Sequence, residues 1–484
     1  MAAGVIAADE ADGLTPLRRM RAILGGSLGN LVEWYDWFVY SAFTLYFADH
    51  FFPKGDRTAQ LLQAAAIFAV GFLARPIGAW AMGYYADRIG RRAALALAVA
   101  LMSLGSFAIA VIPSFETIGV AAPIALTIAR VLQGLSLGGE YGASATYMSE
   151  MAGKRRRGFW SSFQYVTLVM GQLVATLVLV VLQHTLDKAQ LQDWGWRIPF
   201  AIGGVLAITV FWIQSSLDES TAFEKVKVAD RAKLNPVHMR WVLILLGVAL
   251  VICAGLFASR NPNALTLSVA VLVAWQLSLV APLIKRHPME VLMVLGLTAG
   301  GSLAFYAYTT YVQKFLVNTS GFSKDTAAAI SAGSLIVYML IQPIMGHLSD
   351  RWGRKTNIAI TFVLGAALTY PIFVALGHAT SMVTALALTS ALCVIHSGYS
   401  SVSGLVKAEL FPTAVRAMGV ALPYAIANTI FGGTAEYVAL WFKGAHHESG
   451  FYIYVSVMMG LALLIAVRLR NTNAVDLVKQ DTTP

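Results

Sequence analysis

The chain has 484 residues, of which 57% are hydrophobic and only 12% are charged, and its mean hydropathy is +0.67. So few charges cannot cover a water-soluble surface but suit one that faces lipid, which excludes a soluble globular protein and predicts an all-α polytopic membrane protein. The net charge of +10 requires no nucleic-acid partner, because the basic residues gather in short loops, as on the cytoplasmic side of membrane proteins.

Apolar stretches long enough to cross a hydrocarbon core follow one another from near Ala22 to near Val467. By the rule of about 20 residues per span we count about 14 of them. The loops between them leave no room for a soluble catalytic domain, so an enzyme is not expected. The first stretch contains Glu33 and Asp36 and lacks a small-residue cleavage site, which predicts a retained span and a cytoplasmic amino terminus.

Ionisable side chains inside these stretches are costly in lipid and are therefore candidates for function. Glu33 and Asp36 share one helix face. Two carboxylates in a medium of low dielectric constant repel each other, which favours proton binding by one of them. We therefore predict proton coupling at Glu33 or Asp36, with Glu140 as a third candidate. The alternative is that the carboxylates only anchor Arg75 or neighbouring hydroxyl groups.

Glu33 and Arg75 are expected at similar depths of consecutive antiparallel spans, and we predict that they lie close together. A guanidinium group suits recognition of a substrate carboxylate. For Arg75 the alternative is a structural counter-ion, and for Arg130 it is a side chain that reaches to the membrane surface. Three glycines on the helix of Arg130 have a spacing that permits close helix packing.

Lys314, Arg197 and Glu436 are expected near the outer ends of their helices, where interfacial anchoring is the simpler interpretation. Lys314 is kept as a substrate candidate because Tyr308 and other hydrogen-bond donors surround it in the sequence. His396 is expected to be a hydrogen-bonded structural residue. The predicted substrate-binding residues are Arg75, Arg130, Gln164, Tyr308 and Lys314.

One cationic signature occurs twice, as GYYADRIGRR at Gly83–Arg92 and as GHLSDRWGRK at Gly346–Lys355, and a second repeat begins at Glu150 and Glu409. The chain is therefore expected to contain two related halves. The predicted parts are a cytoplasmic segment 1–21, a six-helix bundle 22–215, a cytoplasmic linker 216–238, an extra transmembrane hairpin 239–285, a second six-helix bundle 286–468 and a cytoplasmic tail 469–484. The hairpin is an even insertion, so both halves keep their orientation.

The acidic residues of the repeated loops follow helices and stand beside arginines, so they can cap helix starts or pair with cations. Such contacts would exist only when one end of the two bundles is closed. The predicted gating residues are Asp87, Arg88, Arg91, Asp350, Arg351 and Arg354. No phosphate-binding GxxxxGK[ST] loop is present, so an ion or substrate gradient is expected to drive any transport. Cys253 and Cys393 lie in apolar runs and are expected to be buried small hydrophobic residues.

The twin loops resemble those of the major facilitator superfamily. Within it, Gly29–Asp36 (GNLVEWYD), Arg75–Gly78 (RPIG) and Gly138–Gly142 (GGEYG) are similar to motifs of the metabolite:proton symporter branch. Ser144–Glu150 and Tyr311–Asn318 are similar to the bacterial 2-oxoglutarate permeases of that branch. The resemblance runs from about Arg21 to Arg468 and fails at the expected hairpin.

This resemblance implies two six-helix bundles in a bacterial inner membrane, with both termini cytoplasmic, and proton-coupled uptake of a small dicarboxylate, 2-oxoglutarate first, by alternating access. Its repeated loops latch the inner gate. The implied partners are an organic anion and the lipid bilayer, the chain is expected to be a monomer, and neither a metal nor a cofactor other than the coupling proton is expected. Alternatives are a symporter for shikimate, another dicarboxylate or an osmolyte such as proline or betaine, and a membrane sensor that transports nothing.

Overall fold

The computed structural model describes residues 16–53, 55, 57–88, 91–151, 156–215, 283–411 and 416–469, with a few isolated positions between 267 and 275. Within the helices, the side chains of residues 16–28, 83–88, 91–96, 139–151, 210–211, 213–215 and 416–417 are outside this description. The predicted linker and nearly all of the predicted hairpin 239–285 also lie outside the described residues. Every element in the described ranges is helical.

The described helices fall into two groups that follow each other in the chain. The first group contains α2 (Pro16–Phe51), α3 (Arg57–Leu73), α4 (Arg75–Arg88), α5 (Arg91–Val111), α6 (Phe115–Ile118), α7 (Ala121–Met151), α8 (Arg157–Ser161), α9 (Phe163–Thr185), α10 (Lys188–Asp193), η1 (Gly195–Arg197) and α11 (Ile198–Ser215). The second contains α16 (Pro288–Tyr306), η2 (Ala307–Tyr311), α17 (Val312–Asn318), α18 (Lys324–Trp352), α19 (Arg354–Gly377), α20 (Met382–Glu409), α21 (Arg416–Ala427), η4 (Asn428–Gly432), α22 (Ala435–Gly444) and α23 (Ser449–Ala466).

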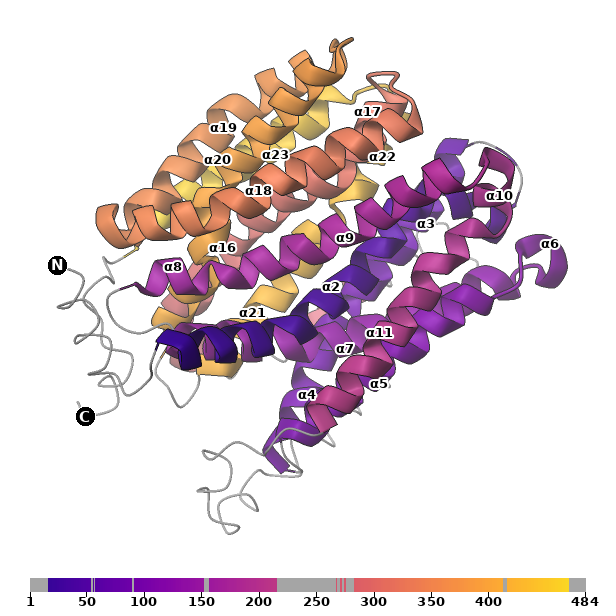
Figure 1. Ribbon diagram of the computed structural model, residues 1–484. Helices are drawn as coiled ribbons and strands as arrows, with labels where there is room; N and C mark the ends of the chain where they lie inside the picture. The colour runs from indigo at the N-terminus through magenta and orange to yellow at the C-terminus, as the bar shows by residue number, and fades with distance from the viewer. Residues whose placement is uncertain are drawn as a thin grey trace, which may run out of the picture.

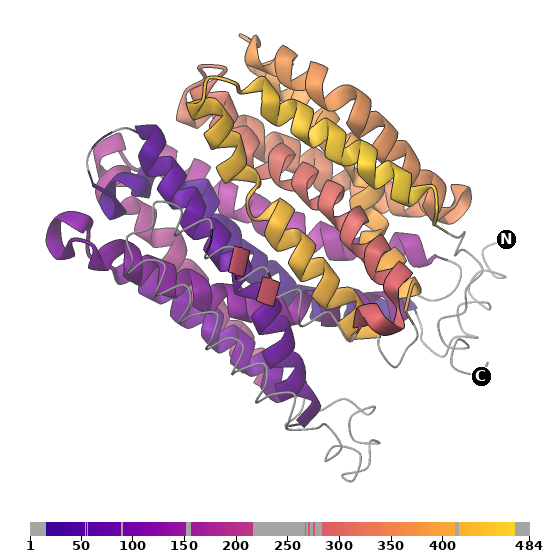
Figure 2. The ribbon, with the colours of Figure 1, turned by 180° about the vertical axis from the view of Figure 1, so that it is seen from behind.

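The two groups lie side by side with their helices roughly aligned (Figures 1 and 2). In the first group α2 packs against α9, and α7 packs against α4 and α5. In the second, α18 and α19 pack against α20, and α23 packs against α16 and α19. Between the groups, α18 lies against α8 and α9, and α21 lies against α4 and α7. Both groups therefore contribute to one extended interface.

Eight helices or helix runs in the described part of the chain are long and apolar enough to cross a membrane. Large apolar side chains on their outer faces are exposed, for example Val383 at 75% and Val111 at 73%. Because water would disfavour so much exposed apolar surface, these faces are suited to lipid. The predicted count of 14 spans includes segments outside the described residues and stays a prediction.

Local sequence explains several helix ends. Ser323 precedes α18, and its hydroxyl accepts a hydrogen bond from the backbone N–H of Thr326. Asp187 and Gln190 form a reciprocal capping box at the start of α10. Gly353 has a φ of 94° between α18 and α19, a conformation that a residue with a β-carbon rarely adopts. The second cationic loop therefore needs its central glycine for the turn between two long helices.

Glycines on α7 bring this helix close to α3 and α4. A β-carbon at Gly134 would lie 2.0 Å from the carbonyl oxygen of Gly71, and one at Gly138 would lie 2.0 Å from the carbonyl oxygen of Arg75. Such distances are far below van der Waals contact, so these positions require glycine. The close approach also brings the backbone of Arg75 next to the helix that carries Arg130.

Hydrogen bonds join the two groups near both ends of their interface. At one end, where α18 ends and α8 begins, the carboxylate of Asp350 accepts hydrogen bonds from the backbone N–H groups of Gly158 at 2.8 Å and Phe159 at 3.0 Å. At the other, where α18 begins and α2 ends, the Lys324 ammonium group donates to the carbonyl oxygen of Leu45 at 2.9 Å. We refer to these as the Asp350 end and the Lys324 end.

Two helices of the second group contain π-helical turns. These turns are η2, between α16 and α17, and η4, between α21 and α22. They lie close to each other, because α16 packs against η4 and α22 packs against η2. π-Helical turns widen a helix locally and are frequent at functional sites. Both turns contact the first group: in η4 the hydroxyl of Thr429 donates to the carbonyl oxygen of Phe72 at 2.7 Å, and in η2 the carbonyl oxygen of Thr309 accepts from Gln172 at 3.0 Å.

Candidate functional site

Two arginines share one aromatic side chain in the first group. The guanidinium carbon of Arg75 lies 4.1 Å from the ring centroid of Trp37, and that of Arg130 lies 3.9 Å from the same centroid. Arg75 also lies 3.9 Å from the ring of Phe72, and Arg130 lies 4.5 Å from the ring of Tyr40. Aromatic faces attract cations, so these rings stabilise two buried positive charges. We call Arg75, Arg130 and Trp37 with the neighbouring Glu33 and Asp36 the two-arginine site.

Both arginines keep hydrogen-bond donors unused. They are 3% and 0% exposed, and within the described part of the chain Nε and Nη2 of each have no hydrogen-bond partner. Arg130 does donate through Nη1 to the amide oxygen of Gln133 at 2.7 Å, and Gln133 in turn donates to Ser106 at 2.8 Å. Leaving a buried charged donor unpaired is expensive, so these donors are suited to an anion that enters the site.

The two carboxylates of α2 lie beside these cations. Glu33 is buried and interacts electrostatically with Arg75. Asp36 is completely buried, lies beside Ser106 and interacts electrostatically with Arg130. A β-carbon at Gly203 of α11 would come within 1.6 Å of an Asp36 oxygen, so α11 leaves room for this carboxylate. The site therefore pairs two cations with two groups that can take up a proton.

The second group contributes Tyr306 and Asn428 to this region. Tyr306 is buried against Phe72 with a centroid separation of 5.2 Å, and it interacts with both Arg75 and Asn428. Asn428 begins η4, and neither its amide nitrogen nor its amide oxygen has a hydrogen-bond partner in the described structure. Sequence reasoning missed Trp37 and Asn428, although Asn428 and Thr429 are polar residues in an otherwise apolar run. Tyr306 was noted only as one of the hydrogen-bond donors near Lys314.

Gln164 and Tyr308 differ in whether their side chains keep a hydrogen-bonding group without a partner in the described structure. The side-chain nitrogen of Gln164 is buried and has no hydrogen-bond partner among the described residues, while the backbone carbonyl oxygen of Gln164 accepts from the Asn30 side chain at 3.3 Å. The hydroxyl of Tyr308 instead forms a hydrogen bond with Thr369 inside the second group. Tyr308 is therefore held within its own group, whereas Gln164 keeps a free donor.

Lys314 and Glu436 are buried, so the interfacial interpretation is wrong for these two residues. The Lys314 ammonium nitrogen lies 2.8 Å from a carboxylate oxygen of Glu436, with side-chain exposures of 0% and 4%. Lys314 also donates to the hydroxyl of Ser41 at 3.2 Å. Arg197 is different, because it donates to the carbonyl oxygens of Ala110 and Ile112 at the end of α5. Only Arg197 serves as an anchor at a helix end.

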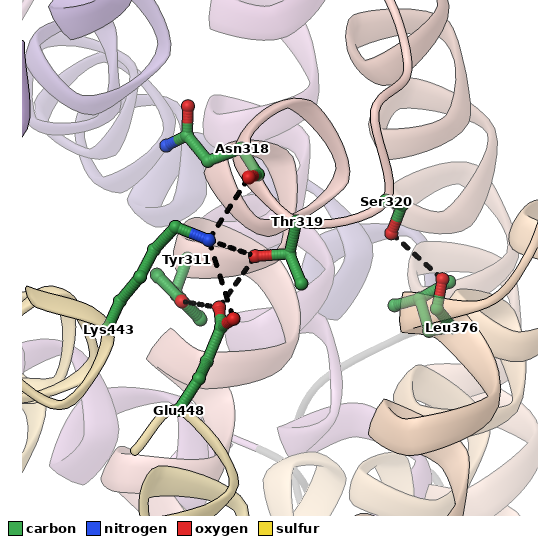
Figure 3. A network of polar contacts seen from close by, with 7 residues as sticks. All are labelled: Tyr311, Asn318, Thr319, Ser320, Leu376, Lys443 and Glu448. Carbon is green, nitrogen blue, oxygen red and sulfur yellow. Dashed lines mark hydrogen bonds and ion pairs between the residues drawn. The ribbon is translucent and has the colours of Figure 1, made fainter. Parts of the chain in front are cut away.

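A polar network fixes α17 to the segment between α22 and α23 at the Lys324 end (Figure 3). The carboxylate of Glu448 accepts hydrogen bonds from Thr319 at 2.6 Å and Tyr311 at 3.1 Å. Lys443 lies 3.4 Å from the same carboxylate and donates to the carbonyl oxygen of Asn318 at 3.0 Å. The ends of α17 and α22 are thus held together within the second group.

The structure describes the side chains of three of the six predicted gating residues. Asp350 binds the start of α8 as described, and Arg354 forms a buried ion pair with Glu409 at 3.2 Å, whereas Arg351 is exposed. The backbone at Asp87, Arg88 and Arg91 is helical. Their side chains, like that of Glu140, lie outside the described residues.

His396 is held in one tautomer. Its Nε2 lies 2.9 Å from the carbonyl oxygen of Gly301, and its Nδ1 lies 2.6 Å from the hydroxyl of Tyr338. Because a carbonyl only accepts, Nε2 carries the proton and Nδ1 accepts from the tyrosine. Both ring nitrogens are satisfied by the second group itself, which agrees with a structural role.

Comparisons with known proteins extend over nearly the whole chain. Residues 22–234 and 246–483 match the family described as sugar (and other) transporter. The chain is 47% identical over 452 residues to the alpha-ketoglutarate permease of Escherichia coli strain K12, covering 93% of this chain and 94% of that protein. It is 30% identical over 453 residues to the citrate-proton symporter of Klebsiella pneumoniae, covering 92% and 90%.

Solved structures show the same fold. The xylose transporter XylE from Escherichia coli, in a partially occluded inward open conformation, aligns with a TM-score of 0.67 at 19% identity, covering 95% of this chain and 99% of that chain. A transporter of the POT family in complex with 5-aminolevulinic acid aligns with a TM-score of 0.63 at 16% identity, covering 92% and 96%. At such low identity these similarities concern the fold alone.

Proposed function

This chain belongs to the sugar (and other) transporter family of the major facilitator superfamily, and from that membership we propose that it takes up a small dicarboxylate together with protons. It is a multi-pass membrane transporter and not an enzyme. 2-Oxoglutarate is the first substrate proposed, because the relative with 47% identity is an alpha-ketoglutarate permease. Proton coupling is proposed because another relative is a citrate-proton symporter.

The observation that carries this proposal is the pair of buried arginines with unused donors. A dianion leaving water needs cations to offset its desolvation, and Arg75 and Arg130 supply two, each with Nε and Nη2 unpaired among the described residues. Gln164, Lys314 and Asn428 are further polar groups at or near the interface between the groups. Tyr308 takes part in binding only if its bond to Thr369 opens.

The proposed proton carrier is Glu33 or Asp36, with Glu140 as the third candidate. When the substrate leaves, each carboxylate can act as counter-ion to the neighbouring arginine. When a proton neutralises it, that arginine is released for the substrate. This exchange of partners would couple proton binding to substrate binding without any covalent step.

Alternating access is the proposed mechanism, with the Asp350 end as the cytoplasmic gate. Contacts between Asp350 and the start of α8 would open when substrate and proton are released inside, while contacts around Lys324 would open outward. Asp87, Arg88, Arg91, Arg351 and Arg354 are proposed to assist at the cytoplasmic end. The proposed topology keeps six helices in each half, the additional hairpin 239–285, and both termini in the cytoplasm.

Uptake of radiolabelled 2-oxoglutarate into proteoliposomes under an imposed inward proton gradient tests the proposal. We expect accumulation above the external concentration, and we expect Arg75→Ala to abolish it. Glu33→Gln should lose dependence on the gradient; if it keeps full dependence, coupling moves to Asp36 or Glu140. Unlabelled citrate, succinate, shikimate, proline and betaine serve as competitors. Failure of wild type to accumulate any of these compounds would refute symport and leave a sensor role.

A further inference from the structure

The ion pair between Lys314 and Glu436 connects three helices from both groups. Lys314 lies on α17, Glu436 lies in the first turn of α22, and Ser41, which accepts from Lys314, lies on α2. A buried ion pair is weak evidence for stability, because the desolvation of both charges offsets their attraction. Stability alone therefore does not explain why this ion pair is buried, and a functional reason is needed.

Glu436 is incompletely satisfied. One carboxylate oxygen lies 2.8 Å from Lys314, but the other, Oε2, is buried and has no hydrogen-bond partner within the described ranges. An unpaired carboxylate oxygen in a buried position is costly, and a proton bound there removes that cost. Glu448, the nearby carboxylate in Figure 3, instead accepts from two hydroxyl groups and pairs with a partly exposed lysine.

The pair stands next to the two-arginine site. Tyr40 bridges the two, since its ring lies 4.5 Å from the guanidinium carbon of Arg130 and it interacts electrostatically with Glu436. Lys314 therefore adds a further buried cation near the two arginines. Its charge is paired directly with the carboxylate of Glu436 at 2.8 Å.

In the described part of the chain, the titratable side chains that face Glu436 are Tyr40 from α2, Tyr311 from η2 and Lys314 from α17. Helices α3, α16 and α23 also pack against α22. Their titratable side chains with described contacts point to other partners: Arg57 to Asp49, Tyr306 to Arg75, Tyr452 to Phe373, and Tyr454 to Phe451. Among the described side chains that face Glu436, Lys314 is the one cation.

We propose that Glu436 is a proton-linked placeholder for a substrate carboxylate. In the empty transporter it holds Lys314; a proton bound at Glu436 releases Lys314, which then binds one carboxylate of the incoming dianion. The inference rests on the proposed function and adds a second proton-linked carboxylate, in the other half of the chain from Glu33 and Asp36. By linkage, substrate binding strengthens proton binding at Glu436 to the same extent.

The proposal predicts the direction in which pH changes the affinity for the substrate. At low pH Glu436 is protonated more often and Lys314 is free, so the substrate binds more tightly. At high pH Glu436 competes for Lys314, so binding weakens. Glu436→Gln removes this competitor, so it should keep only the part of the pH dependence that comes from the proton carrier of the first group.

The test is entrance counterflow of radiolabelled 2-oxoglutarate in proteoliposomes, with equal pH on both sides, at pH 6, 7 and 8. For wild type we expect the half-saturating concentration to rise by about tenfold from pH 6 to pH 8. In Glu436→Gln the rise should be smaller, because only the proton carrier of the first group still contributes, so the variant should bind more tightly than wild type at pH 8. Glu448→Gln is the matched control and should follow wild type, because it removes a carboxylate of the same half that does not contact Lys314.

A wild-type pH profile in Glu436→Gln would overturn the inference and leave the proposed function standing. If wild type exchanges none of 2-oxoglutarate, succinate and citrate, the proposed function is refuted, and the inference that rests on it is refuted too. If Glu436→Gln does not fold, the double variant Lys314→Gln with Glu436→Gln replaces it, because removing both partners leaves no unpaired buried charge. It should bind weakly at every pH, and a remaining tenfold dependence on pH would also overturn the inference.

Discussion

At the scale of single residues, two guanidinium groups lie against the ring of Trp37, and under the proposed function this arrangement selects the substrate. Lysine could supply the same charge at either position. It could not supply a planar fork of donors that contacts an aromatic ring and still offers free N–H groups. The site therefore depends on the shape of the arginine side chain as well as on its charge.

Arg130→Lys tests this dependence. Because the variant loses its contact with Gln133 and at least one hydrogen bond to the substrate, we expect kcat/KM for 2-oxoglutarate uptake to fall about 100-fold, roughly 3 kcal/mol. Arg197→Lys is the control, because Arg197 binds the carbonyl oxygens of Ala110 and Ile112 at the end of α5. Uptake kinetics in proteoliposomes measure both; equal effects of the two variants would contradict the assignment.

At the scale of helices, the sequence predicted the helical class, the membrane location and the family, because hydropathy and repeated motifs are local properties. It also singled out Glu33, Asp36, Arg75 and Arg130, which lie together in the structure, but it missed Trp37, whose ring both arginines contact. It could not predict the burial of Lys314, since that depends on Glu436 from a helix distant in the sequence. Nor could it predict η2, whose residues Ala307–Tyr311 contain neither glycine nor proline and whose widening depends on packing against α22.

Gly138→Ala tests the packing of α7 against α4. The added β-carbon would meet the carbonyl oxygen of Arg75 at 2.0 Å, so the helices must separate, and we expect a loss of about 1–3 kcal/mol of stability. Gly460→Ala on α23 is the matched control, because nothing lies within 4 Å of the added atom; it should leave stability unchanged or raise it by up to about 1 kcal/mol. Thermal unfolding in detergent distinguishes them. Equal melting temperatures would refute the packing argument.

At the scale of the whole molecule, the contact between Asp350 and α8 joins the two halves at one end. A carboxylate that accepts two backbone N–H groups forms charge-assisted hydrogen bonds, which are stronger than neutral ones. We expect this contact to be absent when that end is open. Its loss should therefore shift the equilibrium between conformations and leave the substrate site intact.

Asp350→Asn tests this shift. With the two native cysteines replaced by serine, we would place a cysteine at Ser162, which is buried at this end near Gly346. We expect a thiol reagent to label it about tenfold faster in the Asp350→Asn variant, which corresponds to a loss of roughly 1.4 kcal/mol for the closed state. Glu448→Gln, at the opposite end, is the control. Unchanged labelling in Asp350→Asn would show that the contact does not hold this end closed.

The aromatic rings around the two arginines also affect the step in which the empty carrier reorients after it has released its substrate. A carrier whose cations were balanced by the substrate alone could not reorient without it, and would be confined to one-for-one exchange. Here Trp37, Phe72 and Tyr40 lie against the guanidinium groups, so the unloaded protein retains partial compensation of both charges. We expect it to return empty, and preloaded vesicles should release 2-oxoglutarate into medium that contains none.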